Sequence, residues 1–427
     1  MFSKNKIYAL IFIALLPFFM VSCKSSSTIK DSTITRNSKK SEKAPYVILV
    51  SLDGFRWDYV EKYKPKHLSN FIKNGVQAES LIPSYPSKTF PNHYTIATGM
   101  YPENHGLIGN AFYSYKKDVT YAIRNRDMVE DGTFYGGTPI WVLADQNDMV
   151  SSSYFFVGSE ADIQGVHPTY YRNYDGSITN ETRISETLEW LKLPEAERPH
   201  MLTMYFSDID DIGHKYSPSN DEQLKKAILN LDTQLGALFK GVAETGLDIN
   251  IIIVSDHGMT TVEAENFISI DEVANPEHYT LIDNGSILNI HPKANVTIDS
   301  VLMILKRKEN NFKVYKTKDT PGFEYSPKNK DWGPIQIIPD FGYYFSYPSR
   351  IESMKTNGIT AVGVHGYDTK HKDMHGIFYA NGPAFKSDYI IPSFKNIDIY
   401  PLMCKLLDLK TPTSIDGNLD IIKDALK

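Results

Sequence analysis

Three apolar segments of this 427-residue chain each end in side chains that bind metal ions. They are residues 46–52 before Asp53, residues 250–255 before Asp256 and His257, and residues 201–207 before an acidic cluster. Near-continuous apolar runs of this length predict strands that are buried on both faces, as in a parallel α/β sheet. Because open α/β sheets bind ligands at the carboxyl ends of their strands, the three segments predict one metal-containing active site.

Helices are predicted to alternate with these strands. The clearest helix extends from about residue 221 to 245, where apolar residues recur at steps of three and four: Leu224, Ile228, Leu231, Leu235, Leu238 and Val242. Ser219 and Glu222 predict a capping box at its start, and Gly246 predicts its end. A strand follows at once, and this alternation predicts an α/β fold with a mainly parallel sheet sandwiched by helices.

The start of the chain differs in composition from the rest. The first 22 residues combine a positive start with apolar residues 7–19, which predicts a secretory signal too short to span a membrane. Met20-Val21-Ser22-Cys23 resembles a bacterial lipobox, which implies a lipid-modified Cys23 and a membrane partner; the alternative is a plain signal peptide. Residues 23–44 are rich in Ser, Thr and Lys and predict a flexible tether. We therefore expect a lipid-anchored protein of the bacterial cell envelope, exported to the periplasm or cell surface.

Residues 45–427 contain no low-complexity break and predict one catalytic domain. Between about residues 259 and 362 the apolar segments become short, which predicts a small α+β lobe inserted into that domain. The formal net charge of −6 argues against a stable nucleic-acid partner. Cys23 and Cys404 are the two cysteines, so no disulfide is expected within the domain.

Six Asp and His side chains are candidate metal ligands: Asp53, Asp210, His214, Asp256, His257 and His365. Asp210 and His214 share a face if they lie on one helical turn. Asp256 and His257 are adjacent at a strand end, so we expect them to point apart toward neighbouring metals. Six mixed carboxylate and imidazole ligands exceed the needs of one zinc ion and predict two metals, as in phosphoryl transfer. Each residue alone also has a structural explanation, and the prediction depends on their combination.

Several longer segments carry a resemblance to a known family: SLDGFRWDY, PSKTFPNHYTIATGMYPENHGLIGN, GTPIW, DIDDIGHKYSP, IIVSDHGM, GVHGYD and MHGIFYANGPAF. In order and spacing, the chain resembles the nucleotide pyrophosphatase/phosphodiesterase family of the alkaline phosphatase superfamily. The resemblance covers residues 45–385 and implies an alkaline phosphatase-like fold with a catalytic centre of two zinc ions.

The resemblance also implies individual roles. One zinc ion would be held by Asp53, Thr89, Asp256 and His257, and the second by Asp210, His214 and His365. Thr89 matches the family nucleophile, while His93 and His105 receive no metal role. The family often has Glu-Pro-Asp where this chain has Asp208-Ile209-Asp210, so Asp208 is an alternative ligand; otherwise Asp208 and Asp211 are expected to support or cap. Asn110 is the expected donor to phosphoryl oxygens, with the Thr89 backbone N–H; alternatively it is a turn residue.

The expected substrate is a small phosphodiester or nucleotide. The Cys/Ser-x-Pro-x-Arg motif of sulfatases is absent from the segment around the nucleophile, Ser87-Lys88-Thr89-Phe90-Pro91. Lys88 is adjacent to Thr89, but its side chain is expected to point away from the phosphate of a monoester. Phe90 and Tyr205 match aromatics that stack on the base in nucleotide-cleaving relatives; alternatively both are core residues. Other tyrosines could line the pocket, namely Tyr154, Tyr170, Tyr171 and Tyr174.

The predicted reaction is hydrolysis of nucleotide phosphodiesters or pyrophosphates to nucleoside 5′-monophosphates through a phosphothreonine intermediate. Aromatic side chains could equally enclose a choline group, so a phosphodiesterase of choline- or glycerol-bearing diesters is an alternative. A non-catalytic surface-binding lipoprotein is an alternative of another class, against which the intact set of candidate ligands argues.

Overall fold

The computed structural model describes residues 35–427; the predicted signal segment, Cys23 and residues 23–34 lie outside the described residues. Residues 35–44 are packed against the domain, so the predicted tether is wrong for this part. The Asn37 side-chain amide donates hydrogen bonds to the carbonyls of Glu195 (2.8 Å) and Arg198 (2.7 Å) and accepts one from the Val150 N–H (2.8 Å). A polar side chain with three backbone partners anchors this stretch in spite of its composition. Between residues 35 and 427, no helix is long and apolar enough to cross a membrane.

The main sheet of the described residues has eight strands. Their order is β19 (Tyr389–Ile391), β2 (Val76–Ala78), β18 (Phe378–Asn381), β9 (Ile249–Val254), β1 (Tyr46–Leu52), β8 (Met201–Phe206), β6 (Ser151–Tyr154) and β7 (Tyr170–Arg172). The five strands from β9 to β7 are parallel to one another, and β18 is antiparallel to both of its neighbours. The mainly parallel sheet predicted from the apolar runs is confirmed.

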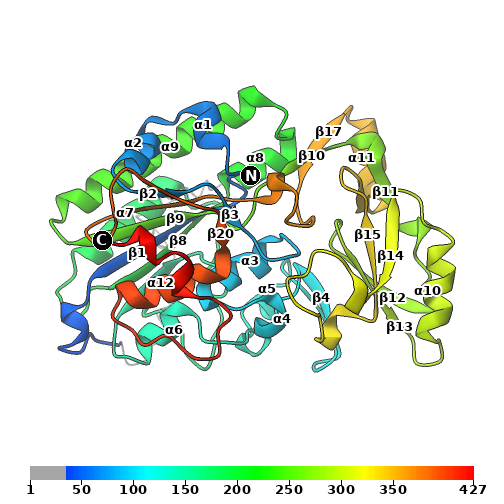
Figure 1. Ribbon diagram of the computed structural model, residues 1–427, viewed down its shortest axis with the longest axis horizontal. Helices are drawn as coiled ribbons and strands as arrows, with labels where there is room; N and C mark the ends of the chain where they lie inside the picture. Colours follow the sequence, from blue (N-terminus) through cyan, green and yellow to red (C-terminus); the bar gives the residue numbers. More distant parts are fainter. Residues whose placement is uncertain (1–34) are drawn as a thin grey trace, which may run out of the picture. The chain divides into compact units, whose positions relative to one another are not determined.

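Helices cover both faces of this sheet (Figure 1). On one face lie α3 (Thr89–Thr98), α6 (Ile140–Asp145) and α12 (Ile399–Leu406), which share a core with Val47 and Leu49 of β1. On the other lie α2 (Lys66–Lys73), α7 (Asn180–Leu191) and α9 (Asp221–Glu244), packed on Ile48 and Val50. Alternate residues of β1 therefore face different cores, which explains why the strand is apolar along its whole length.

Helix α9 agrees with the predicted range, but its N-terminal cap differs. The side chain of Asn220, rather than Ser219, accepts a hydrogen bond from the backbone N–H of Gln223. Ser219 Oγ instead lies 2.9 Å from Ser217 Oγ, so the predicted capping box does not form. Gly246 has a left-handed conformation directly after the helix, as predicted for its end.

Residues 260–364 form the inserted lobe. They lie between β9 and β18 in the sequence and have a core of their own. The lobe begins with β10 (Thr260–Glu263) and ends with β17 (Ala361–Val364), which pair antiparallel. Its main sheet is antiparallel, in the order β12 (Tyr279–Asp283), β13 (Leu288–Pro292), β15 (Ile335–Pro339) and β14 (Phe312–Lys316), and it packs with α10 (Ile298–Lys306). Figure 1 shows this sheet beside the main sheet, on the right.

Shorter elements complete the described chain. Four short helices are α1 (Tyr59–Tyr63), α4 (Pro102–His105), α5 (Arg126–Val129) and α11 (Pro348–Thr356), and α8 (Asp208–Tyr216) follows β8 directly. The remaining strand pairs are β4 (Ala111–Ser114) with β5 (Val119–Ala122), β11 (Phe267–Ser269) with β16 (Tyr344–Ser346), and β3 (Leu81–Ile82) with β20 (Phe394–Lys395). The loops after β1, β8 and β9 meet at one edge of the main sheet, where the candidate site lies.

Candidate active site

The register of the central strands brings the predicted carboxylates together. Ser51 near the end of β1 is paired with both Tyr205 of β8 and Val254 of β9, so the three strands end side by side. Gly54 then turns with a φ of +67°, and a Cβ atom there would lie 3.0 Å from the Cα of Asp210. A glycine is therefore needed for the chain after Asp53 to approach α8 so closely.

One group of side chains surrounds the Nε2 atom of His257. This atom lies 3.0 Å from Asp256 Oδ2, 3.5 Å from Asp53 Oδ1 and 3.2 Å from the hydroxyl of Thr89. The exposed fraction of the Asp53, Asp256 and His257 side chains is 2% or less. The expectation that the Asp256 and His257 side chains point apart is wrong, because β9 ends at Val254 and the strand alternation no longer applies; that they serve neighbouring metals stays a prediction.

A second group is built around Asp210. Its Oδ2 atom lies 3.3 Å from His214 Nε2, and its Oδ1 atom lies 3.9 Å from His365 Nε2. Asp210 and His214 are on one turn of α8, as their spacing predicts. The His365 ring stacks on the His257 ring with centroids 3.6 Å apart, so the two groups adjoin.

The three candidate ligand histidines share one hydrogen-bonding pattern. Their Nδ1 atoms donate to backbone carbonyls: His214 to Gly363 (2.8 Å), His257 to Gly258 (2.9 Å) and His365 to Ser87 (2.8 Å). Each Nε2 atom is therefore unprotonated when the ring is neutral, and it faces the carboxylates. This is the arrangement by which proteins fix the tautomer of metal-binding histidines.

The carboxylates lack enough donors to balance them. Asp53 Oδ1, Asp210 Oδ1 and Asp256 Oδ2 are buried without a hydrogen-bond partner among the described residues. Burial, together with the nearby Asp256 and Asp210, raises the pKa of Asp53 well above its usual range. Burial acts in the same sense on Asp256, but the neighbouring His257 and His93 hold the pKa of that carboxyl well below its usual range. A divalent cation would supply the missing charge, and the mixed oxygen and nitrogen donors fit zinc.

Donor atoms converge in two triplets that share no residue. Asp210, His257 and His365 form one, and Asp53, His93 and Asp256 form the other, each with its ligand atoms within 4.8 Å of one another. His93 is the member that sequence reasoning set aside. Its Nδ1 donates to the carbonyl of Thr89 (3.0 Å) and its Nε2 lies 2.8 Å from Ser51 Oγ, so both ring nitrogens have protein partners. The four-residue spacing from Thr89 was the sequence signal for this contact.

Thr89 is the first residue of α3, and its side chain is half-buried. A helix N-terminus favours an anion, but in α3 residue 91 is a proline and the Asn92 N–H donates to the Lys88 carbonyl (3.1 Å). Asn110 Oδ1 accepts a hydrogen bond from the backbone N–H of Phe90 (3.1 Å). The amide nitrogen of Asn110 is thereby left to donate, which supports its expected role beside Thr89.

The aromatic residues divide into two sets. The Tyr205 hydroxyl donates to Asp53 Oδ2 (2.7 Å), and its ring meets that of His93 edge-on. Tyr174 is 43% exposed, with its ring centroid 6.4 Å from that of Tyr205, and Phe90 is partly buried. The other three candidate tyrosines have different partners: Tyr154 and Tyr170 pack on Trp190, and Tyr171 stacks on His167. Tyr174 is therefore the member of that set that adjoins the candidate site.

The other acidic residues of α8 turn to different partners. Asp208 accepts hydrogen bonds from the Asn180 side-chain amide at 3.0 and 2.9 Å. Asp211 accepts one from the Ser207 hydroxyl at 2.9 Å. Both arrangements agree with the expected supporting or capping roles, and Asp210 is the residue of this cluster that faces His214 and His365.

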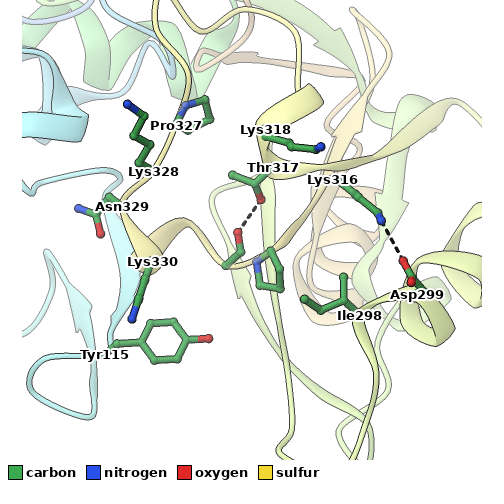
Figure 2. Close-up of a pocket in the computed structure, with 12 residues that line it drawn as sticks. Tyr115, Ile298, Asp299, Lys316, Thr317, Lys318, Pro327, Lys328, Asn329 and Lys330 are labelled. Atoms are coloured by element: carbon green, nitrogen blue, oxygen red, sulfur yellow. Dashed lines mark hydrogen bonds and ion pairs between the residues drawn. The ribbon is translucent and has the colours of Figure 1, made fainter.

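A separate cavity of ≈ 640 Å³ lies between the inserted lobe and the hairpin of β4 and β5. Four lysines line it, namely Lys316, Lys318, Lys328 and Lys330. Figure 2 shows that their amines point in different directions, and that of Lys316 pairs with Asp299 at 2.9 Å. The cavity includes none of the candidate ligands and does not present a convergent anion site.

Comparison with known proteins places this geometry in a family. The family profile for type I phosphodiesterase/nucleotide pyrophosphatase matches residues 47–368. The chain belongs to this family. Bis(5′-adenosyl)-triphosphatase ENPP4 of Bos taurus is 34% identical over 383 residues, which is 88% of this chain and 81% of the relative. Venom phosphodiesterase CdcPDE of Crotalus durissus collilineatus is 33% identical over 426 residues, which is 95% of this chain and 50% of the relative. The chain thus spans about half the length of the venom enzymes it matches.

Solved structures agree with this family. Murine ectonucleotide pyrophosphatase/phosphodiesterase 5 has a TM-score of 0.83 and 31% sequence identity, covering 90% of this chain and 100% of the other. A second structure of the same murine protein contains an inactive threonine-to-alanine variant in complex with AMP. Its TM-score is 0.82, at the same identity and coverage. The alkaline phosphatase-like fold expected from the sequence is confirmed.

Proposed function

We propose that the chain is a two-zinc phosphodiesterase/nucleotide pyrophosphatase that releases nucleoside 5′-monophosphates. The observation that carries this proposal is the orientation of His214, His257 and His365. Their Nε2 atoms all face carboxylates, and that of His257 lies beside the Thr89 hydroxyl. In this proposal Asp53, Thr89, Asp256 and His257 hold one zinc ion, and Asp210, His214 and His365 hold the second.

Thr89 is the proposed nucleophile. A bound zinc pair would lower the pKa of the Thr89 hydroxyl and offset the negative charge of the phosphoryl group. Thr89 Oγ would then form a bond to phosphorus while the bond to the leaving oxygen breaks. The Asn110 side-chain amide and the Thr89 backbone N–H would donate to the non-bridging oxygens, whereas the Phe90 N–H already donates to Asn110 Oδ1. Water would hydrolyse the phosphothreonine and restore the hydroxyl.

A diester fits the surroundings of Thr89 better than a monoester. The second negative charge of a monoester requires a cationic donor near the nucleophile. Lys88 is adjacent in sequence, but its amine donates to the His365 carbonyl and the Tyr344 hydroxyl, both at 2.9 Å. Since Lys88 has these partners, it is not placed to neutralise that charge.

Two observations support a nucleotide as part of the substrate. Tyr174 exposes 43% of its surface near Tyr205, and Phe90 follows the nucleophile directly, so both can offer a ring face to a base. Stacking of this kind contributes about 1–3 kcal/mol per base. Among the relatives, one is named a bis(5′-adenosyl)-triphosphatase and another was solved with AMP.

Steady-state hydrolysis tests the proposal. The purified chain, loaded with zinc, would be compared on p-nitrophenyl thymidine 5′-monophosphate, p-nitrophenyl phosphorylcholine and p-nitrophenyl phosphate. We expect the highest kcat/KM for the thymidine diester and two zinc ions per chain by mass spectrometry. A preference for phosphorylcholine would replace nucleotides by lipid head groups as substrates. A folded chain that binds no zinc and hydrolyses none of the three would contradict the enzymatic assignment.

We also propose that the chain is anchored in the cell envelope through lipidated Cys23. The proposal is supported by the composition of the first 23 residues. Cys23→Ser is expected to shift the protein from the membrane fraction to the soluble fraction of the envelope, measured by fractionation and mass of the N-terminal peptide. An unmodified Cys23 in the wild-type chain would contradict it.

A further inference from the structure

We propose that Lys88 is a positioning residue that couples the inserted lobe to both sides of the active site. The inference rests on the proposed function, because it concerns how His365 and Asn110 are held for that reaction. It is supported by the contacts that Ser87 and Lys88, the two residues before Thr89, make with residues between 284 and 367.

Ser87 fixes the segment that carries His365. The Ser87 carbonyl accepts from His365 Nδ1 at 2.8 Å, and its hydroxyl accepts from the Gly366 N–H at 3.0 Å. The same hydroxyl donates to the Tyr367 carbonyl at 2.9 Å. Three consecutive residues of this segment are thus bonded to one residue of the nucleophile loop, two positions before Thr89.

Lys88 adds a buried cation to this connection. The residue is 4% exposed, and its amine donates to the His365 carbonyl and to the Tyr344 hydroxyl. Gly366 has a φ of +107°, and a Cβ atom there would lie 2.4 Å from Lys88 Cε, so the lysine stem packs directly on that backbone. A buried ammonium group keeps its bonds because losing them leaves a desolvated charge without a partner.

Tyr344 extends the contact to the other side of the site. It lies on β16 of the inserted lobe, and its hydroxyl donates to the Asn284 carbonyl at 3.3 Å. The Asn284 side chain in turn accepts from the Ala111 N–H (3.0 Å) and donates to the Ala111 carbonyl (2.9 Å). Ala111 follows Asn110, the expected donor to the phosphoryl group. One lysine therefore links the lobe to the His365 segment, while the tyrosine it contacts links to the Asn110 segment.

Lys88→Met tests this role, because methionine keeps most of the stem and removes the charge. We expect kcat to fall by about 10–100-fold, as for other groups that orient metal ligands, with a much smaller change in KM. We expect faster loss of one zinc ion to a chromophoric chelator and faster amide hydrogen exchange in residues 363–367 and 110–112. Tyr344→Phe, which removes one hydroxyl, is expected to give a smaller change of about three- to tenfold in kcat.

Lys395→Met is the matched control. Lys395 is half-buried, donates to the Tyr101 hydroxyl at 3.0 Å and lies over that ring, yet it contacts no candidate ligand. Its substitution is expected to leave kcat, zinc retention and exchange in residues 363–367 unchanged. An equal loss in Lys395→Met would overturn the proposal, because the effect would then be general destabilisation.

The outcomes separate the positioning role from the proposed function. A folded Lys88→Met chain with wild-type kcat, zinc retention and hydrogen exchange would overturn the positioning role. If the wild-type chain binds no zinc, the proposed function fails, and hydrogen exchange alone decides whether Lys88 holds the two segments. If Lys88→Met does not fold, the same measurements on Tyr344→Phe decide, and unchanged exchange there would overturn the inference.

Discussion

The two groups of candidate ligands differ in burial and in what holds them. The buried half consists of Asp53, Thr89, Asp256 and His257, and its carboxylates and imidazole are at most 2% exposed. The open half consists of Asp210, His214 and His365. Here the exposed fraction of the side chain reaches 36% for His214 and 14% for Asp210.

This difference follows from the fold. The acidic residues and histidine of the buried half follow the central strands β1 and β9, so sheet register brings them together, and the Tyr205 hydroxyl also contacts Asp53. The open half combines a turn of α8 with a loop after β17, and its two imidazoles are oriented by the carbonyls of Gly363 and Ser87. The buried half is thus set by the core, whereas the open half depends on how the inserted lobe is docked.

Removing the proposed nucleophile, Thr89, should cause the largest change in rate. Thr89→Ala deletes the attacking hydroxyl of the buried half but leaves all six Asp and His ligands. We expect kcat on a nucleotide diester to fall by at least about 10³-fold. Two zinc ions per chain should remain by mass spectrometry. Thr89→Ser is the control and should keep measurable covalent catalysis, while substantial diesterase activity in Thr89→Ala would exclude a phosphothreonine intermediate.

Removing one ligand of the open half should release one metal ion and leave the other bound. His214→Ala removes an exposed ligand, so we expect one zinc ion to be lost, one to be retained, and kcat to fall by about 100-fold or more. His257→Ala should lose both, because its ring lies between the halves and stacks on His365. Measured zinc contents of two per chain in His214→Ala would show that the halves do not act as separate sites.

After chelation removes the metal ions, the buried carboxylates should make the stability of the chain depend on pH. In the metal-free chain, burial raises the pKa of Asp53 above that of the unfolded chain. The folded state then binds the proton more tightly, so stability falls as pH rises from about 4 through the raised pKa. Asp53→Asn should remove this slope and stabilise the metal-free chain near neutral pH, while weakening zinc binding.

Denaturant unfolding in excess chelator, at several pH values, measures this effect. Asp175→Asn is the control, because Asp175 is exposed and hydrogen bonds from the Ser177 hydroxyl and N–H lower its pKa, the opposite of the effect on Asp53. It should change stability little. Equal pH slopes in the wild-type and Asp53→Asn chains would mean that the buried half carries no such repulsion.

The sequence predicted parts of both halves. The strands before Asp53 and Asp256 were visible as apolar runs, and the spacing of Asp210 and His214 predicted their common helical face. The partners of Lys88 were not predictable, because His365 and Tyr344 lie more than 250 positions away and meet it through tertiary packing. Local rules also failed where several side chains compete, as at the Asn220 cap and at the paired Asp256 and His257.

Tyr205 shows the same limit and gives the smallest expected effect. The resemblance implies that its ring stacks on a base, and the structure adds a contact that the sequence did not predict: its hydroxyl donates to Asp53 Oδ2 at 2.7 Å. Tyr205→Phe removes this bond and keeps the ring, so we expect zinc affinity of the buried half to fall about 10-fold with no change in base preference.

Tyr205→Ala removes the ring as well, and the pair of variants separates the two roles. The ratio of kcat/KM for p-nitrophenyl thymidine 5′-monophosphate to that for bis(p-nitrophenyl) phosphate measures base preference, and chelator competition measures zinc affinity. Tyr171→Phe is the control, because that ring stacks on His167. If Tyr205→Phe keeps wild-type zinc affinity while Tyr205→Ala loses the thymidine preference, the ring binds the base and the hydroxyl does not orient Asp53. The buried half would then owe its geometry to strand register alone.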